Sequence, residues 1–266
     1  MKLTVLTDNN TYIDQYYLGE PALCFYIEEK DRKILFDTGY SDVYLRNAEK
    51  MGIDLRGVDT IAFSHGHNDH TGGLAFFPKT DRSVRIIAHP DTFLQRRDET
   101  GEIGSPLIEE EIEKRFTLSI HRDPVRITED LLWLGEIPVT VPFEKRLPIG
   151  TVLRKGKQEE DNIYDDTALV YEKEDGIFVI SGCSHSGICN IVEYARKVTG
   201  KQKVLGVIGG FHLLKEDSRL LTTADWLKQQ RIEMLYPCHC VSLAAKIVLA
   251  KEMPIREVGT GMLLEI

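Results

Sequence analysis

Short β-rich runs, in which apolar residues dominate between polar ones, make up much of the first third of the chain and predict strands. Five runs have this pattern: Lys2–Thr7, Ala22–Glu28, Lys33–Asp37, Thr60–Ser64 and Val84–Ala88. One helix is expected among them, because an apolar stripe at helical spacing follows Ser41, a candidate N-cap, and Gly52 supplies a stop. This part of the chain therefore predicts a β-rich half with one helix.

The last hundred residues alternate regularly between strand-like and helix-like patterns. Strands are expected at Thr167–Tyr171, Ile177–Ile180, Val204–Ile208 and Ile232–Leu235, and helices at Gly187–Val198, Thr223–Gln230 and Ser242–Ala250. Strands packed into sheets with helices between them indicate a layered α/β protein. Two sheets with helices outside both is the preferred arrangement, and a single doubly wound sheet is the alternative.

No repeat or Ser/Gly/Pro linker divides the sequence, so one domain spanning 1–266 is expected. The stretch 91–161 is highly charged and carries only short apolar runs. We interpret it as an insertion on the core, serving as a lid or as a dimer contact.

Composition narrows the classes of partner. The 266 residues carry 33 Lys plus Arg against 42 Asp plus Glu, a net charge of −9. This balance argues against nucleic acid and against a membrane surface as partners, since both require clustered positive charge. The longest apolar runs are strand-sized and the N-terminus lacks an apolar signal core, so a cytoplasmic location is expected. Five cysteines, an odd number, are expected to be reduced.

The strongest chemical signal is the run of ten residues from Ser64 to Gly73, directly after a predicted strand. It holds His65, His67, Asp69 and His70 within six residues. In an extended loop the first two imidazoles project the same way and can share one metal ion, while Asp69 and His70 can face a second. A histidine-rich surface loop is the alternative, but the chain has only 8 histidines in all. A metal site is therefore favoured.

This His-x-His-x-Asp-His string resembles the signature of the metallo-β-lactamase superfamily, and Ile34–Gly39 resembles that family's strand ending in Asp-x-Gly. The resemblance implies a four-layer αββα sandwich, here with an insertion around 91–161. It also implies that Asp37 buttresses the metal loop without binding metal.

Two later strand ends are expected to complete the ligand set. His185 follows the predicted strand Ile177–Ile180, and His239 lies between Cys238 and Cys240, which we expect to be packing residues. Many superfamily members carry a bridging aspartate where this chain has Cys183, whose thiol is open to two interpretations, as a ligand or as a buried packing group.

Three further residues lie near these positions. Asp165 and Asp166 precede a predicted strand, where an aspartate is more often a solvated turn residue, although a role at the site is also open. His212 follows two glycines after another strand and fits a general acid, a donor to a substrate anion, or a core histidine held by the backbone.

The strings around Cys183, His212 and His239 resemble the superfamily branch of 7,8-dihydropterin-6-yl-methyl-4-(β-D-ribofuranosyl)aminobenzene 5′-phosphate synthases. The resemblance implies an enzyme with two divalent ions, most simply zinc with manganese or iron as alternatives. It is expected to be a hydrolase with a metal-activated water or a synthase with a metal-bound diphosphate, acting on a small anionic, phosphorylated substrate of pterin type. Asp69 is then expected to ligate metal and orient the nucleophile, and His212 to donate a proton.

Two other functions are kept open by the sequence. One is a non-catalytic metal-containing binding or sensor protein, since the bridging aspartate is replaced. The other is a redox di-iron member, although such proteins typically carry Glu where this chain has His67.

Overall fold

The computed structural model describes residues 1–266 and shows two compact units. Unit 1 comprises Met1–Arg122, Pro148–Asp165 and Gly259–Ile266, and unit 2 comprises Asp123–Leu147 and Asp166–Val258. The expectation of one domain spanning the chain stays a prediction, and each unit is described by itself.

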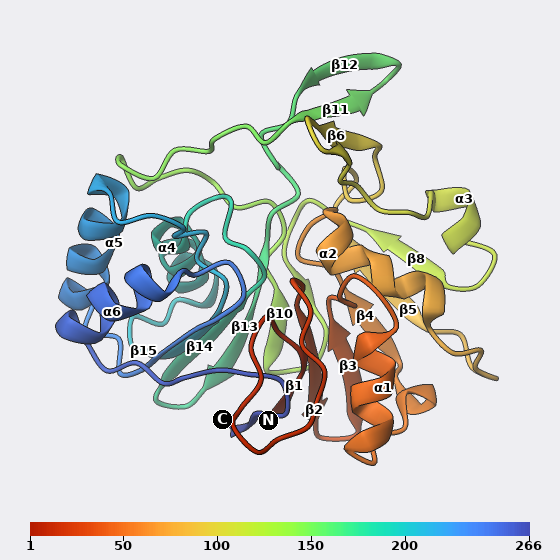
Figure 1. Ribbon diagram of the computed structural model, residues 1–266, viewed down its shortest axis with the longest axis horizontal. Helices are drawn as coiled ribbons and strands as arrows, with labels where there is room; N and C mark the ends of the chain where they lie inside the picture. Colours follow the sequence, from red (N-terminus) through yellow and green to blue (C-terminus); the bar gives the residue numbers. More distant parts are fainter. The chain divides into compact units, whose positions relative to one another are not determined.

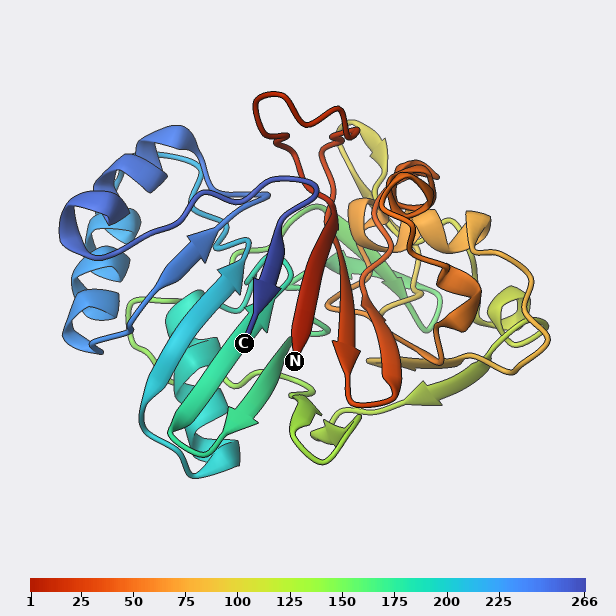
Figure 2. The same ribbon diagram turned by 90° about the horizontal axis from the view of Figure 1, so that it is seen from below.

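Unit 1 is built on a seven-stranded sheet (Figure 1). Its order is β17 (Leu263–Glu265), β1 (Lys2–Thr7), β2 (Cys24–Glu29), β3 (Arg32–Phe36), β4 (Thr60–Ala62), β5 (Arg85–Ala88), β8 (Thr117–Ile120). The first four strands are antiparallel neighbours, so the two chain ends lie side by side in β1 and β17 (Figure 2). From β3 to β8 the strands are parallel. The carboxyl ends of β3 and β4 therefore meet at one edge, which places Asp37 beside the metal loop.

Short helices connect the strands of unit 1. They are α1 (Val43–Lys50), η1 (Leu55–Gly57), α2 (Asn68–Thr71), η2 (Gly72–Phe76) and α3 (Glu109–Ile112). Tyr44 and Ala48 of α1 join the core that Leu35, Ile61 and Ile86 form on the sheet. The apolar stripe predicted for this helix is therefore its buried face.

A second, four-stranded sheet of unit 1 has the order β12 (Lys157–Glu160), β11 (Thr151–Arg154), β6 (Arg96–Asp98), β7 (Gly101–Glu102). These strands come from the charged stretch 91–161. The same stretch also supplies β8 to the large sheet of unit 1, and β9 and β10 to unit 2. The expected insertion is thus distributed over several sheets.

Unit 2 contains one six-stranded sheet with helices packed on it. Its order is β16 (Leu235–Pro237), β15 (Val204–Gly209), β14 (Gly176–Ser181), β13 (Ala168–Lys173), β10 (Leu131–Trp133), β9 (Val125–Arg126). Strands β14, β15 and β16 are parallel. The helices are α4 (Ile188–Thr199), α5 (Ser218–Gln229) and α6 (Leu243–Glu252), and all three bury apolar residues in one core with the sheet (Figure 1).

The mixed α/β class and the preference for two main sheets over a single doubly wound sheet are confirmed. Several boundaries differ from the predicted ones by one or two residues, and three differences are larger or change a cap. The strand expected at Ile232–Leu235 begins only at Leu235, and α5 begins before Thr223 because the Asp217 side chain caps the Leu220 N–H. Ser41 is not the N-cap of α1, since its hydroxyl donates to Glu20 and the helix begins after Asp42. No helix combines the length and apolarity needed to cross a membrane.

Candidate metal centre

The His-x-His-x-Asp-His string of unit 1 forms a tight loop between β4 and α2. His65 and His70 are fully buried, and His67 is nearly so. His65 Nε2 and His67 Nδ1 lie 3.0 Å apart, while His70 Nε2 lies 3.5 Å from an Asp69 carboxylate oxygen. The loop therefore holds two close pairs of side chains, His65 with His67 and Asp69 with His70; that each pair binds an ion stays a prediction.

One buried carboxylate orients two of these imidazoles. Asp37 Oδ2 accepts hydrogen bonds from the Ser64 hydroxyl at 2.7 Å and from His70 Nδ1 at 2.7 Å. Having donated its proton to Asp37, the Ser64 hydroxyl accepts from His65 Nδ1 at 2.9 Å. Both histidines are thus held as the tautomer whose lone pair lies on Nε2, the form that binds a metal ion. This is the buttressing role that the family resemblance implies for Asp37.

The protonation state of the loop also suits metal binding. Burial lowers the pKa of His67 to about 4, with smaller contributions from the surrounding charges. Neutral imidazoles with an adjacent carboxylate form the donor set that zinc and similar divalent ions prefer. The residues of this loop therefore fit a divalent metal.

Asp165 lies in unit 1 and contacts the metal loop directly. Its Oδ2 accepts from the Gly66 N–H at 2.7 Å, and its Oδ1 accepts from Arg96 at 2.6 Å. Burial, the largest single influence, raises the pKa of Asp165, but the positive charge of Arg96 together with His89 and His67 brings that pKa below its ordinary value. The solvated-turn interpretation of this residue is wrong, because Asp165 is buried against the ligand loop.

Unit 2 places its candidate residues at three neighbouring strand ends. Cys183 and His185 follow β14, His212 follows β15, and His239 follows β16. Because these strands are parallel and adjacent, their carboxyl ends meet at one edge of the sheet.

The side chains at this edge lie close together. The Cys183 thiol sulfur lies within 4.8 Å of a His239 ring nitrogen, and the rings of His185 and His212 are 4.6 Å apart between centroids. Proximity to His239 favours the ligand interpretation of Cys183 over simple packing. Cys240, by contrast, accepts the His212 N–H on its sulfur at 3.3 Å, and Cys238 is fully buried, in line with packing roles.

Unusual backbone conformations and a second carboxylate shape these loops. Ser184, His212 and His239 all have positive φ, between 48° and 59°, which non-glycine residues adopt rarely and which concentrates at functional sites. Asp166 accepts from the backbone N–H groups of His185 and Ser186 at 3.0 and 2.9 Å. Asp166 is therefore a buried loop anchor, and the solvated-turn interpretation is wrong for it too.

Sequence reasoning missed two residues at the unit 1 site. Ser64 gives no signal beyond its place before the motif, yet it transmits the Asp37 contact to His65. Arg96 lies in a charged stretch that we interpreted as an insertion, and its buried contact with Asp165 spans 69 residues of sequence. A charge pair this distant leaves no local pattern.

Comparison with known proteins agrees with this geometry. The sequence profile of the metallo-beta-lactamase superfamily matches residues 18–239. A 7,8-dihydropterin-6-methyl-4-(beta-D-ribofuranosyl)-aminobenzene-5′-phosphate synthase of Methanocaldococcus jannaschii is 33% identical over 270 residues, covering 95% of this chain and 91% of that protein. An uncharacterized protein of the same archaeon is also 33% identical, over 255 residues, covering 94% of each chain.

A solved structure is similar over the full length. It is the crystal structure of Tm1679, a metal-dependent hydrolase of the beta-lactamase superfamily, with a TM-score of 0.87, 29% identity and coverage of 100% of this chain and 99% of that one. The superfamily and the name of the synthase relative indicate an enzyme, and the grouped His, Asp and Cys side chains are candidate ligands for divalent metal. The chain belongs to the metallo-β-lactamase superfamily.

Proposed function

We propose that this protein is a dinuclear metal enzyme that acts on a phosphorylated small molecule with an aromatic portion. The proposed metal ligands are His65, His67, Asp69 and His70 in unit 1, and His185 and His239 in unit 2, with zinc as the first choice. The observation that carries this proposal is the Asp37–Ser64 network, which presents the Nε2 lone pairs of His65 and His70 for binding.

When bound, divalent ions supply Lewis acidity and positive charge for phosphate oxygens, which an acidic protein otherwise lacks. The protein's own groups then move the protons. Asp69 accepts a proton from the nucleophile, which is water in a hydrolase or an arylamine in a synthase. His212 donates a proton to the leaving oxygen, since its ring lies beside His185 and its backbone is held by Cys240.

The proposal of an aromatic portion is supported by a cavity of about 660 Å³ in unit 1, beside the metal loop. Asn68 and Gly72 of the loop region line it, together with Tyr40, Phe76 and Ile108, which are 53%, 52% and 43% exposed. Large apolar side chains exposed around one cavity are typical of ligand sites. The relative's name, which contains a dihydropterin and an aminobenzene, agrees with a flat ring bound there.

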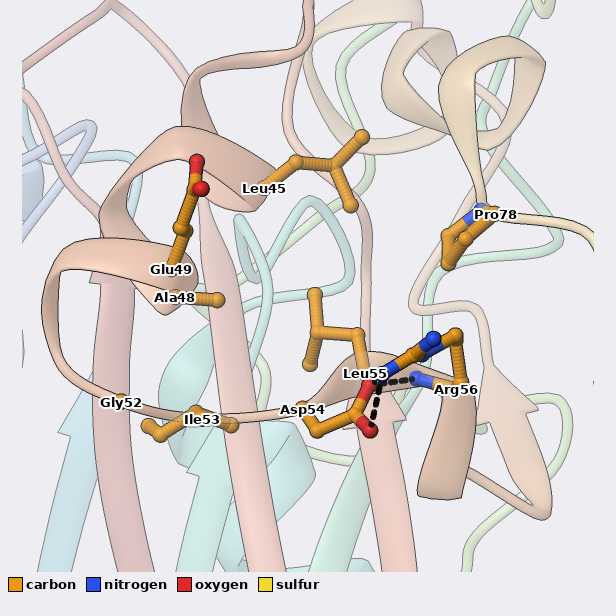
Figure 3. Close-up of a pocket in the computed structure, with 9 residues that line it drawn as sticks. All are labelled: Leu45, Ala48, Glu49, Gly52, Ile53, Asp54, Leu55, Arg56 and Pro78. Carbon is orange, nitrogen blue, oxygen red and sulfur yellow. Dashed lines mark hydrogen bonds and ion pairs between the residues drawn. The ribbon is translucent and has the colours of Figure 1, made fainter.

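A second cavity of unit 1, about 470 Å³, offers no comparable chemistry (Figure 3). Its lining contains no histidine, cysteine or aromatic residue, and its most polar feature is the exposed ion pair between Asp54 and Arg56. We therefore assign substrate binding to the cavity beside the metal loop.

A synthase would form a C–N bond at the pterin methylene carbon and break the C–O bond to diphosphate, whereas a hydrolase would add water at phosphorus and break a P–O bond. One protein sample is therefore tested with a substrate set for each reaction. The protein is purified and its metal content is measured by elemental analysis. Turnover of the substrate bis(p-nitrophenyl) phosphate is then measured before and after the metal is removed with a chelator. The second substrate set is a pterin-methyl diphosphate together with a ribosylaminobenzene phosphate, and its turnover is measured as the release of pyrophosphate. We expect about two ions per chain and chelator-sensitive turnover with at least one substrate set.

A non-catalytic metal-binding protein is the second candidate function, and Cys183 favours it because it replaces the bridging aspartate of many superfamily members. The matched variants are His67→Ala and His121→Ala, the latter changing a histidine outside the motif. The binding function would be supported if His67→Ala lost metal, His121→Ala kept it, and neither the wild type nor either variant turned over any substrate. Unchanged activity after loss of metal would refute both.

A further inference from the structure

We propose that Asp165, held by Arg96, is a positioning residue that fixes the peptide between His65 and His67 and so sets both imidazoles toward a shared ion. This inference rests on the proposed metal function. It assigns a specific task to a buried ion pair that neither the sequence motif nor the proposed chemistry uses.

The contact is made at the centre of the ligand pair. Gly66 separates His65 from His67, and its N–H donates to Asp165 Oδ2 at 2.7 Å. The other oxygen of the same carboxylate accepts from Arg96 Nη2 at 2.6 Å. Rotation of this peptide would swing both ring donors, whose facing nitrogens are 3.0 Å apart. The carboxylate therefore controls a distance on which a shared ion depends.

The loop packs against the guanidinium without any spare space. A Cβ atom added at Gly66 would lie 1.9 Å from Arg96 Nη1 and 2.0 Å from the Thr92 carbonyl oxygen. Arg96 Nη1 in turn donates to that same carbonyl at 3.2 Å. Glycine at this position thus allows the arginine and its carboxylate partner to lie directly against the ligand-bearing backbone.

Only a carboxylate at position 165 can accept hydrogen bonds from both of its neighbours, Gly66 and Arg96. Gly66 and Arg96 each present an N–H donor, so both oxygens must accept. An asparagine would turn its NH₂ group toward one of the two donors. Because the groups are buried, a mismatched donor pair is not relieved by water.

Asp161 provides a matched control within the same ion pair. It accepts from Arg96 Nε at 2.6 Å and is as deeply buried as Asp165. Its other oxygen accepts from the Ile163 N–H at 3.0 Å, away from the metal loop. Asp161→Asn therefore removes the same charge from the same guanidinium but leaves the Gly66 contact in place.

The experiment compares Zn²⁺ affinity in the full-length wild type, Asp165→Asn and Asp161→Asn, by competition with a chromophoric chelator. The visible spectrum of each Co²⁺-substituted protein reports ligand geometry, and thermal denaturation of the metal-free proteins reports stability. We expect Asp165→Asn to weaken Zn²⁺ binding about 10–100-fold and to shift the Co²⁺ bands, as outer contacts of metal ligands do. Asp161→Asn should keep the wild-type spectrum and lose stability to a similar degree.

The inference would be overturned if all three proteins bound Zn²⁺ with equal affinity. It would also be overturned if both variants lost Zn²⁺ affinity in proportion to their loss of stability. Should Asp165→Asn fail to fold, Asp165→Glu serves instead, because it keeps the charge for Arg96 but moves the oxygen from Gly66. It should fold and still weaken Zn²⁺ binding about 10-fold or more. A wild type that binds no metal would refute the proposed function itself, whereas tight binding unaffected by either variant would refute only this inference.

Discussion

The donor residues of the two units are organised in opposite ways. In unit 1 the four candidates lie within six residues of one loop, whereas in unit 2 they follow two different strands, Cys183 and His185 after β14 and His239 after β16. The first arrangement is determined by a local turn, and the second by the parallel register of β14, β15 and β16. A metal half-site can therefore be encoded either in a motif or in the topology of a sheet.

The anchoring carboxylates differ in the same sense. Asp37 accepts from the ring of His70, a candidate ligand, as well as from the hydroxyl and N–H of Ser64. Asp166 accepts from no imidazole ring; it accepts the backbone N–H groups of His185 and Ser186 and the Ser186 hydroxyl, and thereby holds a loop. Unit 1 thus orients imidazoles one by one, while unit 2 orients the segment that carries them.

The largest expected effect is on activity and metal content, and it should differ between a metal ligand and a proton donor. His67→Ala should lose metal and fall to the activity of the chelated protein, because its Nδ1 belongs to the pair with His65. His212→Ala should keep its metal and lose about 10²–10⁴-fold in kcat, as expected for a general acid. Elemental analysis and steady-state kinetics of both variants test this difference. Metal loss in His212→Ala would instead make that residue a ligand.

The two anchors give the next largest effect. Asp37→Asn should weaken metal binding about 10–100-fold, because an amide has one acceptor oxygen and cannot accept both the Ser64 N–H at Oδ1 and the Ser64 hydroxyl and His70 ring at Oδ2. Asp166→Asn should lower the free energy of unfolding by about 1–3 kcal/mol, because it leaves a buried N–H donor without an acceptor. It should reduce metal affinity by less than about 10-fold. Urea denaturation and chelator competition measure the two quantities. Weaker metal binding in Asp166→Asn than in Asp37→Asn would reverse the proposed division of roles.

The same contrast explains what the sequence could predict. The metal loop was predictable because three histidines and Asp69 lie within six residues, and β1 was predicted at its observed bounds from its run of strand-forming residues. His185 and His239 could be nominated from their strand-end positions, but only β14–β16 pairing shows which strand ends are neighbours. Arg96 and the anchoring roles of Asp165 and Asp166 depend on contacts between segments distant in sequence, which no local pattern records.

A smaller effect on stability and metal binding is expected when two glycines are each replaced by alanine. Gly66→Ala should destabilise unit 1 by about 1–3 kcal/mol through overpacking against Arg96 and Thr92, and it should also weaken metal binding. Gly200→Ala changes the C-cap of α4, where φ is 72° and no atom lies within 4 Å of the added carbon. It should cost about 1–2 kcal/mol for the left-handed backbone and leave metal affinity unchanged. Equal effects on metal binding would mean that Gly66 is merely a stability position.

The smallest effect concerns the helix that follows the His239 loop. The Ser242 hydroxyl caps α6 by accepting the Ala245 N–H at 3.1 Å. Ser242→Ala should reduce the free energy of unfolding by about 1 kcal/mol, and Ser242→Asp should restore it, because both serine and aspartate cap well. If the sheet register positions His239, metal affinity stays at the wild-type value in both variants despite the loosened helix start. A fall in affinity with Ser242→Ala that Ser242→Asp reverses would show that the cap, rather than β16, sets the position of this donor.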